Sequence, residues 1–88
     1  MNGKVHDVRD VWVDDTHLHL EVDGGRYRIR LADCSAQLAQ ATPAQRQWLE
    51  ISPDGYGIHW PAPDEDLAIT PLLEQAEQEP ARLELASV

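Results

Sequence analysis

Polar and apolar side chains alternate over two segments in the first half of the chain, residues 16–22 and residues 26–31. Such alternation is typical of a strand with one buried face, so each segment is predicted to form a strand. The stretch from Val5 to Val13, with Trp12 in it, is rich in valine but alternates imperfectly, which predicts a further strand with a bulge. The apolar positions of the two alternating segments are Leu18, Leu20, Val22, Tyr27, Ile29 and Leu31.

Asp23 and Gly24 separate the two alternating segments and suit the central positions of a type I′ turn. A three-residue loop would mix the buried and exposed faces, which a half-buried sheet does not tolerate. A four-residue loop keeps the faces pure and remains the competing register. The two-residue turn pairs Val22 with Gly25, Leu20 with Tyr27 and Leu18 with Ile29.

A helical segment and a second hairpin are predicted to follow. Residues 34–41 are rich in Ala, Gln and Leu, which favour helix. Thr42 to Gln45 has the pattern of a capping box, with proline at the first helical position. A second hairpin is predicted to turn at residues 53–55. Its first strand carries Leu49 and Ile51, and its return strand carries Tyr56, Ile58 and Trp60 on one face.

The C-terminal part is predicted to be an irregular acidic link over residues 61–66 and a final helix over residues 69–76, which Pro80 ends. The predicted fold class is therefore α+β: an antiparallel three-stranded meander, a helical segment, a second hairpin and a short C-terminal helix. Residues 1–80 are expected to form one domain, and residues 81–88 a frayed tail.

The apolar side chains of both hairpins are expected to share one core. Phenylalanine is absent, so the three tryptophans matter for this core. Trp48 and Trp60 are predicted to be buried. For Trp12, the sequence gives the weakest indication of burial.

The chain is acidic, and its charge is uneven. Its 88 residues carry a net charge of −9, with −2 in residues 1–44 and −7 in residues 45–88. Such a balance repels nucleic acid and anionic lipid, so we expect no direct nucleic-acid or membrane binding. A basic protein partner is favoured, and exposed strand edges make a homodimer conceivable. A single cysteine, with no recognisable signal peptide or membrane-spanning apolar run, predicts a cytoplasmic location.

One candidate interaction surface is a basic strip formed by Arg26, Arg28 and Arg30 together with His17 and His19. The predicted register places these side chains on one sheet face, where they suit an acidic group. A solvated sheet face that is kept soluble by charge is the simpler interpretation. His17 and His19 have a spacing that suits metal chelation, but the neighbouring arginines oppose a cation, and we predict no metal and no cofactor.

A second candidate is a loop or pocket near the second hairpin, with His59, Trp60, Asp64 and Asp66. The acidic run 64–66 is expected to cap the final helix rather than to perform acid–base chemistry.

His59 is the best lone candidate for a general base, but the spacing assigns it no nucleophile. Cys34 is expected near a helix start, which would lower its pKa, although a buried structural thiol is the default interpretation. No catalytic residue is predicted.

Several runs resemble a bacterial family known as domain of unknown function 2442. They are Ala41–Arg46, Trp48, the Gly55–Pro61 run with its Ile-His-Trp-Pro core, and Asp64-Glu65-Asp66-Leu67, and the Leu18–Glu21 strand with Asp23-Gly24 resembles the first hairpin of that family.

The resemblance implies a small α+β domain of unknown activity, and gene pairs reminiscent of toxin–antitoxin modules. Some members carry an additional helix-turn-helix domain. This sequence departs from the family where Ala68 and Thr70 replace the usual Ser and Glu, so Thr70 is expected to cap the last helix about two residues late.

Taken together, the sequence favours a non-enzymatic protein-interaction module, with an antitoxin-like member of a two-gene pair as its more specific form. The alternative is a small-molecule or anion-binding module that uses the basic strip. An enzyme centred on His59 is a third hypothesis.

Overall fold

The computed structural model describes residues 4–78, which form two antiparallel sheets and four short helices. This arrangement confirms the α+β class. The tail predicted for residues 81–88 lies outside the described residues. The elements are β1 (Val8–Val13), β2 (His17–Val22), β3 (Gly25–Arg30), α1 (Leu31–Cys34), α2 (Ala36–Gln40), α3 (Pro43–Gln47), β4 (Glu50–Ile51), β5 (Gly57–Trp60), β6 (Glu65–Ala68), α4 (Ile69–Gln75) and β7 (Glu77–Gln78).

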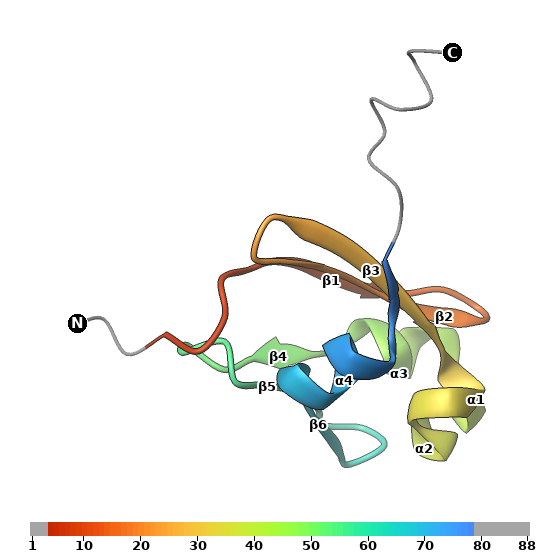
Figure 1. Ribbon diagram of the computed structural model, residues 1–88. Coiled ribbons are helices and arrows are strands. Elements are labelled where there is room, and N and C mark those ends of the chain that lie inside the picture. Colours follow the sequence, from red (N-terminus) through yellow and green to blue (C-terminus); the bar gives the residue numbers. More distant parts are fainter. Residues whose placement is uncertain (1–3, 79–88) are drawn as a thin grey trace.

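The two sheets lie one above the other, with α1 and α2 at one end (Figure 1). The first sheet has the strand order β1-β2-β3-β7, and the second has the order β4-β5-β6. Buried side chains from both sheets belong to a single hydrophobic cluster, which includes Leu18, Leu20, Ile58 and Trp60. The predicted shared core is therefore confirmed, and it lies between the sheets.

The register predicted for the first hairpin is confirmed. Val22 pairs with Gly25, Leu20 with Tyr27 and Leu18 with Ile29. Asp23 and Gly24 have φ values of 53° and 82°, the left-handed conformations that a type I′ turn requires at both central positions. The predicted bulge is also present, since the pairing of β1 with β2 shifts between Val8 and Asp10.

Two short helices, α1 and α2, precede the capping box where one helical segment over residues 34–41 is predicted, and α3 follows the box. The Ser35 hydroxyl accepts a hydrogen bond from Leu38 N–H, so this serine ends α1 and caps α2. The capping box that begins α3 is confirmed, because Thr42 and Gln45 bond reciprocally, side chain to backbone.

The sequence pattern does not predict two of the short strands, β6 and β7. The prediction of an irregular acidic link is wrong for residues 65–66. These residues belong to β6, which pairs with β5 along four residues. β7 pairs with β3, Tyr27 with Gln78 and Arg28 with Glu77. Both pairings join segments whose strand character depends on a partner strand rather than on their own alternation.

The predicted capping of the N-terminal end of the last helix is wrong. α4 begins at Ile69 with Ala68 as its N-cap and no side-chain cap, so neither the 64–66 run nor Thr70 caps it. The Thr70 hydroxyl instead bonds Nε2 of His6. The helix ends at Gln75, before Pro80, and the chain continues into β7.

The three tryptophans differ sharply in environment. Trp60 is fully buried, as predicted, but Trp48 is 57% exposed and the prediction for it is wrong. Trp48 is the C-cap of α3, where the backbone turns from helix to extended structure, and its side chain leaves the core. Trp12 is also largely exposed, on the outer face of the first sheet.

Buried Arg46 connects the core tryptophan to the helices. Its Nε donates to the carbonyl oxygen of Leu38 at 2.9 Å, and its terminal nitrogens donate to the carbonyl oxygens of Ala39 at 2.9 Å and Asp14 at 3.3 Å. The carbonyl oxygen of Arg46 in turn accepts a hydrogen bond of 3.1 Å from Nε1 of Trp60. The arginine thus supplies donors to carbonyl groups at the end of α2, where the Leu38 carbonyl also accepts from the N–H of Ala41.

We expect the Trp60→Phe substitution to lower the free energy of unfolding by about 1–3 kcal/mol, because it leaves the buried Arg46 carbonyl without its indole donor. Trp48→Phe is the matched control and should change stability by less than about 0.5 kcal/mol. Urea denaturation followed by circular dichroism measures both. Equal losses for the two variants would contradict this account of the core.

Candidate functional site

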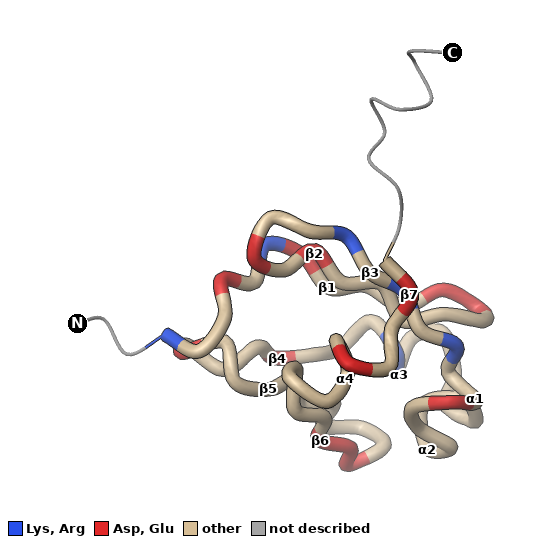
Figure 2. Tube along the Cα trace, in the orientation of Figure 1, with Lys and Arg blue, Asp and Glu red and all other residues tan. Residues whose placement is uncertain are grey.

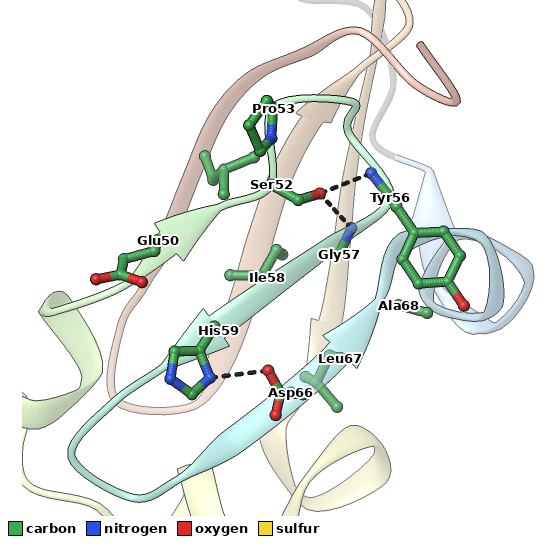
Figure 3. Close-up of a pocket in the computed structure, with 11 residues that line it drawn as sticks. Glu50, Ser52, Pro53, Tyr56, Gly57, Ile58, His59, Asp66, Leu67 and Ala68 are labelled. Carbon is green, nitrogen blue, oxygen red and sulfur yellow. Dashed lines mark hydrogen bonds and ion pairs between the residues drawn. The ribbon is translucent and has the colours of Figure 1, made fainter. Parts of the chain in front are cut away.

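An open groove of about 570 Å³ lies against the β4-β5-β6 sheet beside the turn of the second hairpin (Figure 3). We call it the hairpin groove. Its lining comes from all three strands and from the turn that connects β4 to β5. The local sequence gives this surface a small floor, an apolar wall and an acidic end.

The floor consists of the two smallest side chains of the sheet. Gly57 on β5 pairs with Ala68 on β6, and both line the groove. Because side chains alternate along a strand, they lie on the face opposite to buried Ile58. A Cβ atom on Gly57 would lie 3.1 Å from the carbonyl oxygen of Leu67, so glycine also permits the close approach of β6.

The wall is apolar and comes from the hairpin turn. Tyr56 is 59% exposed and lies beside Ala68, whereas Ile51 and Pro53 line the groove on the side of β4 (Figure 3). Ser52 fixes the turn, because its hydroxyl accepts hydrogen bonds of 3.0 Å from the N–H groups of Tyr56 and Gly57 (Figure 3). The sequence pattern had grouped Tyr56 with the buried face of the return strand, but this side chain points into solvent.

The acidic end is a row of three polar side chains across the strands. Glu50 on β4 pairs with His59 on β5, which pairs with Asp66 on β6. Nδ1 of His59 donates a hydrogen bond of 2.8 Å to Oδ1 of Asp66, since a carboxylate can only accept (Figure 3). The histidine thereby orients one carboxylate at the groove, while Glu50 supplies a second acidic group.

The N-terminal strap, residues 4–7, holds the hairpin turn from behind. The N–H of Val5 donates to the carbonyl oxygen of Asp54 at 2.7 Å. Gly55 has φ of 74°, and a Cβ atom there would lie 2.0 Å from the carbonyl oxygen of His6, so glycine is required for this contact.

The His6 side chain extends the strap to two more elements. Its Nδ1 bonds Oδ2 of Asp23 at 2.7 Å, and its Nε2 bonds Oγ1 of Thr70 at 2.8 Å. A hydrogen bond from the N–H of Asp7 and the contact with His6 hold the pKa of Asp23 below its ordinary value. The strap thus joins the first hairpin, α4 and the turn beside the groove.

The basic strip lies on the outer face of the first sheet, with the predicted pairs His17–Arg30, His19–Arg28 and Glu21–Arg26. Glu21 lies within it, and acidic residues also occur on β6, α4 and β7 (Figure 2). Nε of Arg28 donates to Oε1 of Glu77 at 3.2 Å. Two of the three arginines therefore have a carboxylate on an adjacent strand, which reduces the attraction of the strip for an external anion.

His19 is held within the fold by Asp14 and Trp12. Its Nε2 bonds Oδ2 of Asp14 at 2.8 Å, and its ring stacks on Trp12 with centroids 3.9 Å apart. Partial desolvation raises the pKa of Asp14, but hydrogen bonds from Thr16, His19 and His17 outweigh it and lower the pKa overall. The described residues contain no cluster of His, Cys, Asp or Glu that suits a metal ion.

The four residues predicted near the second hairpin separate in the structure. His59 and Asp66 line the hairpin groove, whereas Trp60 is in the core and Asp64 lies in the turn before β6. Sequence reasoning missed Tyr56 as an exposed wall and the Gly57–Ala68 floor. Gly57 and His59 are two residues apart on β5, which is the sequence signal that places both on the outer face. The partner strand β6, which carries Ala68, was not predicted.

Cys34 lies at the junction of two short helices, directly before Ser35, the N-cap of α2. It is the last residue of α1, and desolvation together with the charges of Asp33 and Glu65 raises its pKa to about 11. The expectation of a lowered pKa is therefore wrong. The default interpretation is a buried structural thiol, and Cys34 has intermediate exposure.

The structure is thus a small two-sheet α+β fold with an apolar surface groove that has an acidic end. The sequence profile of one family, described as Protein of unknown function (DUF2442), matches residues 8–78, and the chain belongs to this family. No curated protein and no solved structure matches the chain significantly. No helix in the described part of the chain is long and apolar enough to cross a membrane.

Asp23→Asn should destabilise the protein at neutral pH and have a smaller effect in acid. Asparagine tolerates positive φ, so the change removes mainly the charge. The folded-state pKa of Asp23 lies below the unfolded value, so its stabilisation is present above the unfolded pKa and is lost as the pH falls through the folded pKa. Urea midpoints between pH 7 and pH 2.5 measure this, with exposed Glu74→Gln as control. A difference from wild type that stays constant with pH would contradict it.

Cys34 should react slowly with iodoacetamide. At pH 8, a thiol with a pKa of about 11 is ionised to only about one part in a thousand, so alkylation should be about 100-fold slower than that of glutathione. Mass spectrometry of timed samples gives the rate. A rate equal to that of glutathione would show that burial does not protect this thiol.

Proposed function

We propose that this protein is a non-enzymatic interaction module that binds a basic partner protein in the hairpin groove. The observation that carries this proposal is the concentration of exposed apolar side chains, Tyr56, Ile51 and Pro53, beside two carboxylates. Protein-binding surfaces commonly combine an aromatic anchor with a polar rim.

The charge of the chain supports a basic partner. Net charge is −9, and the half of the sequence that contains the groove carries most of it. Among the residues that line the groove, none is Lys or Arg. Opposite charge on a partner would raise the association rate and disfavour acidic competitors.

The more specific form of the proposal is an antitoxin-like role in a two-gene pair. It rests on the gene pairing that resemblance to the family implies, together with the small size and acidity of the chain. The partner is then the protein encoded beside this one.

The basic strip is a weaker candidate for binding an anion or an acidic partner. Arg28 bonds Glu77, and Arg26 pairs with Glu21 across the sheet. Exposed charges that are already partnered contribute little additional binding energy.

Tyr56→Ala should weaken the complex about 30-fold or more, as loss of an aromatic anchor commonly does. The partner is first copurified from the native host with the gene neighbourhood intact. Its dissociation constant is then measured by calorimetry for the wild-type chain and each variant.

Trp48→Ala is the matched control, because Trp48 is 57% exposed but does not line the groove. Its affinity should stay within about twofold of wild type. Recovery of only the free chain or a self-dimer, or equal weakening by both substitutions, would overturn the proposed function.

A further inference from the structure

The groove has a geometry that specifies its partner more closely than charge alone, an inference that rests on the proposed function. Its floor, Gly57 with Ala68, and its acidic row, with His59 at the centre, are two consecutive rows on one face of β5. Residues two apart on a strand are separated by roughly 7 Å. An apolar site and a cation site therefore lie roughly 7 Å apart.

The floor suits an apolar side chain. Its two residues leave space above the sheet because they carry a hydrogen atom and a methyl group as side chains. Tyr56 borders this space beside Ala68 (Figure 3). A side chain of leucine size placed there would remove apolar surface from water on both partners, the principal source of affinity at such contacts.

The acidic row suits a lysine or arginine. Glu50 and Asp66 flank His59 from the two adjacent strands, and Asp66 is held by a 2.8 Å hydrogen bond from Nδ1 of this histidine. A cation at this row would form charge-assisted hydrogen bonds with carboxylate oxygens, and those of Asp66 are oriented by His59. An acidic group in the same place would face two like charges.

We infer that the hairpin groove binds an extended segment of the partner in which an apolar residue and a lysine or arginine lie two positions apart. Side chains at positions i and i+2 of an extended segment point to the same side and are roughly 7 Å apart, which matches the spacing of the two sites. Adjacent residues would point to opposite sides and could not fill both sites.

Short synthetic peptides test this spacing. The probe is acetyl-Ser-Leu-Ser-Arg-Ser-amide, and its isomer acetyl-Ser-Leu-Arg-Ser-Ser-amide has the same composition with adjacent residues. Two further peptides replace the arginine of the probe by citrulline or glutamate. Titrations are followed by ¹⁵N–¹H spectra of the whole chain, in which the amide signals of Gly57, His59, Asp66 and Ala68 report groove binding.

The probe should shift these signals and bind at least about 10-fold more tightly than the isomer, the citrulline peptide or the glutamate peptide. Asp66→Asn and Glu50→Gln should each remove most of the preference for arginine over citrulline. Glu74→Gln, an exposed change on α4 outside the groove, should leave it intact.

Equal binding of all four peptides in the groove would overturn this inference while leaving the proposed function standing. Equal binding of probe and isomer would refute the spacing alone. If no peptide shifts the groove signals at millimolar concentration, or shifts occur elsewhere, the inference also fails. The proposed function is then judged separately by the effect of Tyr56→Ala on the native partner.

Discussion

The buried contact between Trp60 and Arg46 is the interaction on which the rest of the fold depends. The indole N–H of Trp60 bonds the backbone of Arg46, and the guanidinium group of Arg46 bonds the carbonyl oxygens of Leu38, Ala39 and Asp14. One cluster therefore connects the second sheet, α2, α3 and the turn between β1 and β2. In a chain of 88 residues without phenylalanine, few other side chains are large enough to fill the space between two sheets.

Features that depend on sequence neighbours were predictable, and features that depend on distant partners were not. Parity together with the Asp23-Gly24 turn signal favoured the observed register of the first hairpin, and the Thr42 capping box followed from four consecutive residues. Trp48 was assigned to the core by size, but its exposure depends on where α3 ends and turns. β6 and β7 are strands because β5 and β3 pair with them, and Glu65 is held by Ser35, 30 residues away.

The candidate site was predictable in part for the same reason. His59 and Asp66 were singled out by residue type, and both line the groove. The floor could not be recognised, because Gly57 and Ala68 have no chemistry of their own and matter only as a pair across two strands. A groove floor formed by two small side chains can be recognised only when the strand pairing that brings them together is known.

Rigidity of the groove is what makes a small surface adequate for binding. The turn that carries Tyr56 is fixed internally by Ser52 and externally by the strap, and His6 ties the strap to Asp23 and Thr70. A partner that docks there does not have to order the loop, so less of the contact free energy is lost to conformational entropy. A groove of this size can therefore discriminate by a few oriented groups, whereas the long, exposed arginine side chains of the basic strip would select poorly among ligands.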